Sequence, residues 1–242
     1  MPKRKNTPKH EPRNRPRGAP QDVEAIRQQI RACLDVLAPN GKKIGSATWG
    51  VYAFYDYDGE PIYVGQTYES LQQRISRHLT NQRSDAVAMN VLDPFEVADI
   101  ELWPLWDLEE VHSRHSAFRE AKRRLAAAEY TVFQLVLSQS SFKAVLNEAD
   151  VAPVAIIDLP LSVKRRIIPD DLYEQRKHPD IRIARRATTI AALARVISER
   201  DLKKHGLRRT LVTQARRLER LATGRFSELG GVVPVKGPDE KE

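Results

Sequence analysis

An Asp-Gly pair between two strand-like segments is the feature that most constrains the fold of this chain. Residues 49–57 and 60–65 are rich in aromatic and β-branched residues, which favour β-strands. Asp58 and Gly59 connect the two segments, and this pair is typical of the tight two-residue turn of a β-hairpin. The sequence therefore predicts two neighbouring antiparallel strands that are joined at this pair.

The register of this hairpin determines where its tyrosines lie. With a two-residue turn, Tyr52 faces Gly65 and Phe54 faces Tyr63 across the pair of strands. Side chains two positions apart on a strand point to the same side of the sheet, so Tyr52 and Tyr63 share one face as diagonal neighbours. A slip of one residue would destroy this arrangement.

Periodicities in the rest of the chain predict an α+β fold. The residues predict a three-stranded sheet and several helices in the core, with a basic helical hairpin at the C-terminal end. The expected elements are a helix over 21–38, a helix over 70–80, a third strand over 98–103, a helical region from a capping box at 107–110 to about residue 137, a short apolar segment at 154–157, and two helices around 183–197 and 211–222 that His205-Gly206 separates.

Charge is distributed unevenly along the chain, whose formal net charge is +8. Basic residues exceed acidic ones by 6 in residues 1–18 and by 11 in residues 162–225, whereas acids are in excess by 7 in residues 19–161. Basic flanks indicate a polyanionic partner. The alternatives are that these cations only solvate helix surfaces, or that the C-terminal helices dimerise the chain. The candidate nucleic-acid contacts are Lys164, Arg165, Arg166, Arg182, Arg185 and Arg186.

Composition divides the chain into a disordered basic tail over 1–20, a folded core over 21–160, a basic helical extension over 161–226 and a flexible tail over 227–242. No apolar run approaches the ~20 residues that a membrane span needs, so we expect a soluble cytoplasmic protein with no membrane partner. The single cysteine, Cys33, excludes an internal disulfide and a multi-cysteine zinc site. No glycine-rich phosphate loop is present, and we expect no nucleotide cofactor.

Two further polar residues follow the hairpin on a predicted helix. Arg74 and His78 are four residues apart, so they lie on one side of that helix. A guanidinium, an imidazole and two phenols can then meet at one edge of the sheet. This set suits phosphodiester hydrolysis, because arginine stabilises charge on the pentavalent phosphate and a phenol or imidazole can orient or deprotonate a water.

The order and spacing of these residues resemble the signature of the GIY-YIG nuclease superfamily. An arginine followed four residues later by a histidine, here Arg74 and His78, is similar to the pattern of the small type II restriction endonucleases in that superfamily. The resemblance is close over residues 49–81 and loose as far as 147. It implies a small antiparallel sheet with flanking helices and hydrolysis that depends on Mg²⁺ or Mn²⁺. The residues that carry it are Gly50-Val51-Tyr52, Tyr63-Val64-Gly65 and Arg74.

The resemblance also implies a metal-binding glutamate on a helix after the third strand. Among Glu109, Glu110, Glu120 and Glu129, we favour Glu129, because an apolar helical stretch follows it as in the family. Glu120 is the alternative, in a more charged stretch that is typical of a solvent-facing surface. Asn147 could take the place of an asparagine that often follows the glutamate in the family, as an accessory residue.

One residue departs from the family pattern. Gln66 follows Tyr-Val-Gly at a position where several relatives carry lysine. If that lysine assists water deprotonation, this chain must use Tyr52, His78 or bulk solvent instead. Our hypothesis is that Tyr52 is the general base and that His78 poises it, which full activity of a Tyr52→Phe variant would rule out.

The sequence therefore predicts a metal-dependent DNA endonuclease, most similar to restriction-type enzymes that cut duplex DNA as homodimers. One alternative is a repair, phage or mobile-element nuclease that recognises DNA structure or nicks one strand. Another is a non-catalytic nucleic-acid-binding module, which the presence of Tyr52, Tyr63, Arg74 and a suitable glutamate disfavours. The recognition site, and DNA rather than RNA as the substrate, are not determined by the sequence.

Overall fold

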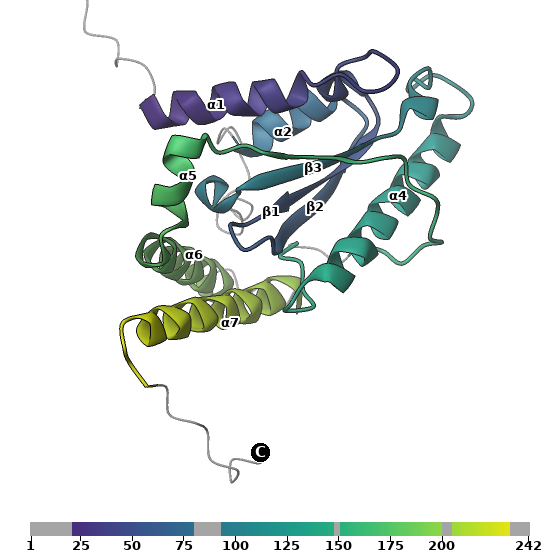
Figure 1. Ribbon diagram of the computed structural model, residues 1–242. Helices are drawn as coiled ribbons and strands as arrows, with labels where there is room; N and C mark the ends of the chain where they lie inside the picture. The colour runs from purple at the N-terminus through teal and green to yellow at the C-terminus, as the bar shows by residue number, and fades with distance from the viewer. Residues whose placement is uncertain (1–20, 80–92, 148–150, 200–204, 233–242) are drawn as a thin grey trace, which may run out of the picture.

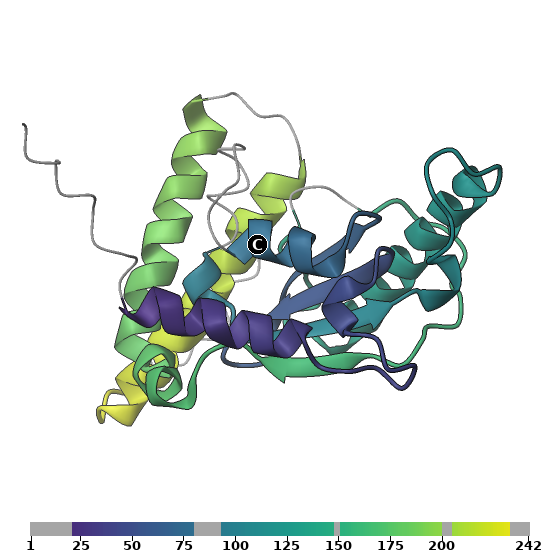
Figure 2. The same cartoon turned by 90° about the horizontal axis from the view of Figure 1, so that it is seen from above.

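The computed structural model describes residues 21–79, 93–147, 151–199 and 205–232. Its described part contains a four-stranded antiparallel sheet in the order β2-β1-β3-β4, with helices packed around it (Figures 1 and 2). The strands are β1 (Gly50–Tyr55), β2 (Pro61–Thr67), β3 (Asp99–Pro104) and β4 (Val163–Arg166). The predicted α+β class is confirmed, but the sheet has four strands where we predicted three.

The unpredicted strand lies in the segment that the sequence assigned to a basic extension. β4 pairs with β3, from Val163 opposite Leu102 to Arg166 opposite Asp99. Its last three residues are exposed cations, because β4 is an edge strand. The apolar alternation that reveals a strand is therefore missing. This part of the extension belongs to the same sheet as the core, whereas the apolar segment at 154–157 is not part of it.

The predicted hairpin register is confirmed, although its turn is longer than predicted. Tyr52 is opposite Gly65 and Phe54 is opposite Tyr63. The strands end at residues 55 and 61, and the carboxylate of Asp56 organises the turn by accepting hydrogen bonds from the backbone N–H groups of residues 58 and 60 at 2.9 and 3.0 Å. A register shift between Phe54 and the next residue absorbs the longer turn, so the tyrosines keep their predicted places.

Helices cover both faces of the sheet, and all six residues of β1 are therefore buried (Figure 1). Helices α1 (Gln21–Leu34) and α2 (Leu71–Leu79) pack on one face together with Tyr52 and Phe54. Helix α4 (Phe118–Gln139) packs on the other. The helices predicted over 21–38 and 70–80 thus exist, although α1 ends before the predicted boundary.

The long helix begins later than predicted. The stretch that resembled a capping box forms a short 3₁₀ helix, Trp106–Leu108, and α4 starts only at Phe118. Glu109 does not reach back to cap a helix, because its carboxylate accepts a hydrogen bond of 2.7 Å from the backbone N–H of Thr48. The glutamate thereby ties this loop to the start of β1.

Among the described residues, three helices follow β4: α5 (Asp170–Lys177), α6 (Pro179–Glu199) and α7 (His205–Glu228). We did not predict α5. α6 and α7 pack against each other around Leu193, Ile197 and Leu207, and His205-Gly206 lies in the first turn of α7 rather than between two helices. The connection at 200–204 falls outside the described residues, so the predicted hairpin is not confirmed.

The predicted disordered tail over 1–20 and most of the predicted C-terminal tail also fall outside the described residues. Among the helices that are described, none combines the length and the apolar character needed to cross a membrane.

Candidate active site

The hydroxyl of Tyr52 is the centre of the predicted cluster. Tyr52 on β1 is fully buried, and its oxygen accepts a hydrogen bond of 3.3 Å from Nε of Arg74 on α2. Nε2 of His78, one turn further along α2, lies 3.3 Å from the same oxygen. The structure therefore brings together the phenol, the guanidinium and the imidazole that the sequence placed on neighbouring elements.

Gly65 allows the two tyrosines to approach each other. The rings of Tyr52 and Tyr63 have their centroids 6.0 Å apart. A Cβ atom at position 65 would lie 2.6 Å from the oxygen of Tyr52 and 2.6 Å from Cε1 of Tyr63. Since both contacts are far closer than van der Waals packing permits, the last residue of the Tyr-Val-Gly sequence must be glycine for the phenols to share this space.

His78 is held in the interior by the aromatic side chains of the hairpin. Only 3% of it is exposed, and its ring centroid lies 5.6 Å from that of Tyr52 and 5.2 Å from that of Tyr63. Leu71 and Ile75, on the same helix, are completely buried. His78 therefore has a rigid orientation next to the Tyr52 hydroxyl.

Glu129 belongs to α4 and lies near enough to Arg74 for the guanidinium to act electrostatically on its carboxyl. The carboxyl is half-buried, and this burial raises the pKa of Glu129 to about 7, while the guanidinium of Arg74 acts in the opposite direction. The alternative metal ligand, Glu120, is exposed and forms an ion pair with Arg123 on the same helix. The surroundings of the two glutamates therefore support the choice of Glu129.

A divalent cation fits this donor set if the substrate supplies most of its ligands. The described residues contain no group of three or more histidine, cysteine, aspartate or glutamate side chains that could hold a metal alone. Mg²⁺ is commonly bound through one or two carboxylates together with waters and substrate phosphates. Glu129 would hold the ion in such a site.

Asn147 binds the main chain of the edge strand β2. Its side-chain oxygen accepts a hydrogen bond of 3.0 Å from the backbone N–H of Val64, and its side-chain nitrogen donates one of 2.8 Å to the carbonyl of Val64. Val64 lies between Tyr63 and Gly65, so Asn147 fixes the strand that carries them. We predicted Asn147 as an accessory residue; in the structure its amide contacts the backbone of β2.

The cations of β4 lie at the other edge of the sheet from β2. Lys164 places its Nζ 3.5 Å from the ring centroid of Tyr55, and Arg166 pairs with Asp170 at 3.2 Å. Together with Arg165, these residues are exposed. They remain candidate contacts for a nucleic acid, but two strands separate them from the strand that carries Tyr63.

Two arginines that we predicted as DNA contacts are buried instead. Arg182 and Arg186 on α6 are 2% and 4% exposed. Arg182 forms a two-pronged pair with Asp58 at 2.8 and 2.6 Å, and Arg186 contacts both Asp56 and Glu96 at 3.2 Å. A phosphate cannot reach guanidiniums that are enclosed with carboxylates in this way, so the structure argues against these two as DNA contacts. Arg185 of the same predicted group also pairs with a carboxylate, that of Asp93 at 3.3 Å, but a third of its side chain is exposed.

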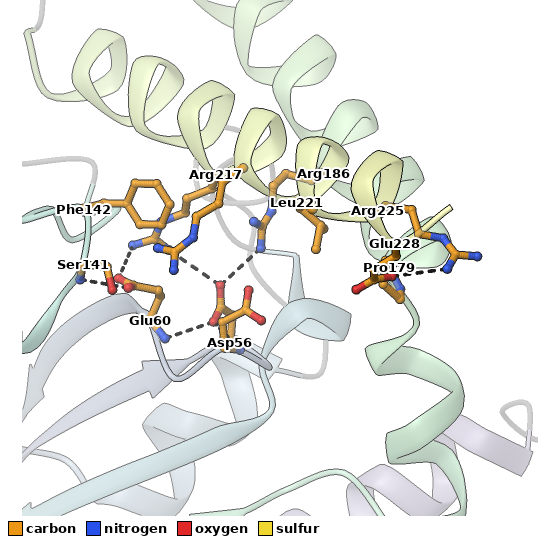
Figure 3. Close-up of a pocket in the computed structure, with 13 residues that line it drawn as sticks. Asp56, Glu60, Ser141, Phe142, Pro179, Arg186, Arg217, Leu221, Arg225 and Glu228 are labelled. Atoms are coloured by element: carbon orange, nitrogen blue, oxygen red, sulfur yellow. Dashed lines mark hydrogen bonds and ion pairs between the residues drawn. The ribbon is translucent and has the colours of Figure 1, made fainter. Parts of the chain in front are cut away.

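Arg217 extends the same ionic cluster from α7 to the hairpin (Figure 3). It donates to the carbonyl oxygens of Pro61 and Ala144 at 3.1 and 3.2 Å, and it lies 3.7 Å from the carboxylate of Glu60 and 4.0 Å from that of Asp56. The cluster therefore fastens both C-terminal helices to the turn of the β1–β2 hairpin.

A cavity of about 360 Å³ lies beside Arg74 and was not predicted. It opens between the end of β2, α2 and α4. Lys122, which lines the cavity, and Glu129, which does not, are two helical turns apart and so lie on one side of α4. The residues that line the cavity are Gln66, Thr67, Tyr68, Glu69, Arg74, Lys122 and Leu125.

Comparison with known families supports the interpretation of this geometry. Residues 48–140 match the family model of the GIY-YIG catalytic domain. The match spans the first three strands, α2 and α4, and includes the tyrosine cluster, Arg74 and Glu129 but not Asn147. No curated protein and no solved structure matched the chain.

Proposed function

We propose that this chain, whose GIY-YIG catalytic domain indicates a nuclease of that superfamily, is a divalent-metal-dependent DNA endonuclease. The observation that supports this proposal most is the position of Arg74. Its guanidinium donates to the oxygen of Tyr52 and is also close enough to Glu129 to act on that carboxyl. One cation thus contacts the phenol cluster of the sheet and acts electrostatically on the acidic residue of α4.

Each residue of the cluster then has a chemical role. Arg74 binds the phosphate and stabilises the negative charge that develops on it during attack by water. Tyr52 is the proposed general base, and the hydrogen bond from Arg74 stabilises negative charge on its oxygen when it has given up a proton. A bound Mg²⁺ or Mn²⁺ would polarise the phosphate and neutralise the leaving oxygen. His78 orients the phenol, and Tyr63, which is less buried than Tyr52, lies nearer the substrate.

The finer proposal is a restriction-type enzyme that cuts duplex DNA, with a homodimer acting on a palindromic site. The test is incubation of a mixed-sequence supercoiled plasmid with Mg²⁺, and with EDTA as the control. Discrete fragments are the expected result. Nicked circles or smears would favour a repair, phage or mobile-element nuclease instead. A mobility shift without any cleavage would show a non-catalytic binding module and contradict the proposed activity.

The pH dependence of cleavage should follow Glu129. Because burial raises its pKa to about 7, the carboxyl is neutral below that pH and becomes a metal-binding carboxylate above it. At limiting Mg²⁺, we expect the cleavage rate to rise with pH through a midpoint near pH 7. Increasing Mg²⁺ should shift the midpoint to lower pH, since the ion competes with the proton for the carboxylate. A midpoint that does not respond to Mg²⁺ would show that Glu129 does not hold the ion.

A further inference from the structure

The cavity beside Arg74 has an electropositive character. Arg74 and Lys122 contribute two positive charges to its lining. Glu69 is the sole acid among the described residues that line it, and it already forms an ion pair of 2.5 Å with Arg77. The carboxylate of Glu69 is therefore partly compensated from outside the cavity. Arg74 also interacts electrostatically with Glu69 and Glu129, so Lys122 is the cation of this lining that is left to attract a further anion.

Lys122 is held at this cavity by aromatic rings. Its Nζ lies 4.6 Å from the ring centroid of Tyr68 and 5.5 Å from that of Phe118. These two rings also pack edge to face, with centroids 6.0 Å apart. Cation–π contacts restrain a long side chain and leave the N–H groups of its ammonium that point away from the rings free to bind an anion. Lys122 is itself exposed, so a ligand can reach it from solvent.

Gln66 gives the cavity a polar group that lacks a partner. Its side-chain oxygen is buried and has no hydrogen-bond partner among the described residues. A buried acceptor of this kind needs a donor from a water or a ligand. The neighbouring residue Thr67 accepts instead from the backbone N–H of Glu69, so the loop itself satisfies the hydroxyl beside it.

The cavity is continuous with the candidate active site through Arg74, which belongs to both. On α4, Lys122 and Glu129 are separated by about 10 Å along the helix axis. A single strand of nucleic acid covers that distance within a few nucleotides. The same strand can therefore contact both residues.

We propose that this cavity binds a backbone phosphate of the substrate close to the scissile phosphodiester, with Lys122 as the contacting cation. The inference rests on the proposed nuclease function. Lys122 is thereby assigned to substrate positioning rather than to chemistry. The ammonium of Lys122 neutralises this neighbouring backbone phosphate. The side-chain oxygen of Gln66 accepts a hydrogen bond from a water or from a donor group of the bound nucleotide.

The test measures binding of a mixed-sequence DNA duplex in EDTA over a series of KCl concentrations. For Lys122→Met we expect the slope of log Kd against log [KCl] to fall by about one unit, because one phosphate contact is lost. Lys122→Arg should retain the slope. The matched control is Arg123→Met, which removes an equal charge from the next position of α4, where the arginine pairs with Glu120, and should leave the slope unchanged.

Equal slopes for wild type and Lys122→Met, or equal losses in Lys122→Met and Arg123→Met, would overturn the phosphate site. The failure of the nuclease proposal has a different signature. A wild-type protein that binds the duplex and cleaves no DNA with Mg²⁺ would contradict that proposal and leave the result for Lys122 intact. Absence of any salt-dependent binding by the wild type would contradict the phosphate site directly.

Discussion

Substituting Arg217 by methionine is expected to lower the free energy of unfolding by about 3–5 kcal/mol. Arg217 is 2% exposed and donates to the backbone carbonyls of Pro61, at the start of β2, and Ala144, after the end of α4. It also lies next to the carboxylates of Asp56 and Glu60. Methionine fills much of the volume but leaves these acceptors buried without a partner, which is what makes the loss large.

Urea denaturation of the two variants Arg217→Met and Arg216→Met measures this effect. Arg216 is the preceding residue of α7 and is exposed, so its substitution should change stability by no more than about 0.5 kcal/mol. Similar midpoints for the two variants would show that the buried ionic cluster does not hold α7 to the hairpin. A loss in Arg217→Met alone would show that it does.

Substituting Arg74 by alanine is expected to reduce the cleavage rate by about 10²–10³-fold, with little loss of stability. The guanidinium is the group that we propose to meet the charge developing on the phosphate, and it also orients the hydroxyl of Tyr52. Arg74→Lys should recover only part of the rate, because an ammonium keeps the charge but not the planar set of donors.

The control for Arg74 is Arg31→Ala, which removes an exposed arginine from α1 on the same side of the sheet. Its cleavage rate should match that of the wild type. Thermal denaturation of the variants separates loss of chemistry from loss of fold. A folded Arg74→Ala protein that cuts DNA at the wild-type rate would remove Arg74 from the active site.

The β1–β2 hairpin could be predicted because its determinants are local. Alternating aromatic and small residues specified β1 and β2, and Asp58-Gly59 marked the turn. The real turn is longer, yet the bulge after Phe54 compensated for it. The same local logic placed Arg74 and His78, since a spacing of four on a helix fixes their common side.

The remaining features depend on contacts between distant parts of the chain. β4 forms a strand because it pairs with the edge of β3. Three of its four residues are cations, so no apolar alternation marks it as a strand in the sequence. Arg186 reads as a surface charge in the sequence, and its partner Asp56 is 130 residues away. A basic helix whose charges lie on the surface and a basic helix whose charges neutralise a buried acidic turn have the same composition. Only the tertiary structure distinguishes them.

The central claim is that Arg74 and Glu129 form the centre of a metal-dependent nuclease. Plasmid cleavage with Mg²⁺ by Glu129→Gln and Glu120→Gln tests it most directly, because both changes remove one carboxylate from α4. We expect Glu129→Gln to be slower than wild type by about 10²–10³-fold, as loss of metal stabilisation worth several kcal/mol requires. Glu120→Gln should cut at the wild-type rate. Wild-type cleavage by Glu129→Gln would contradict the claim.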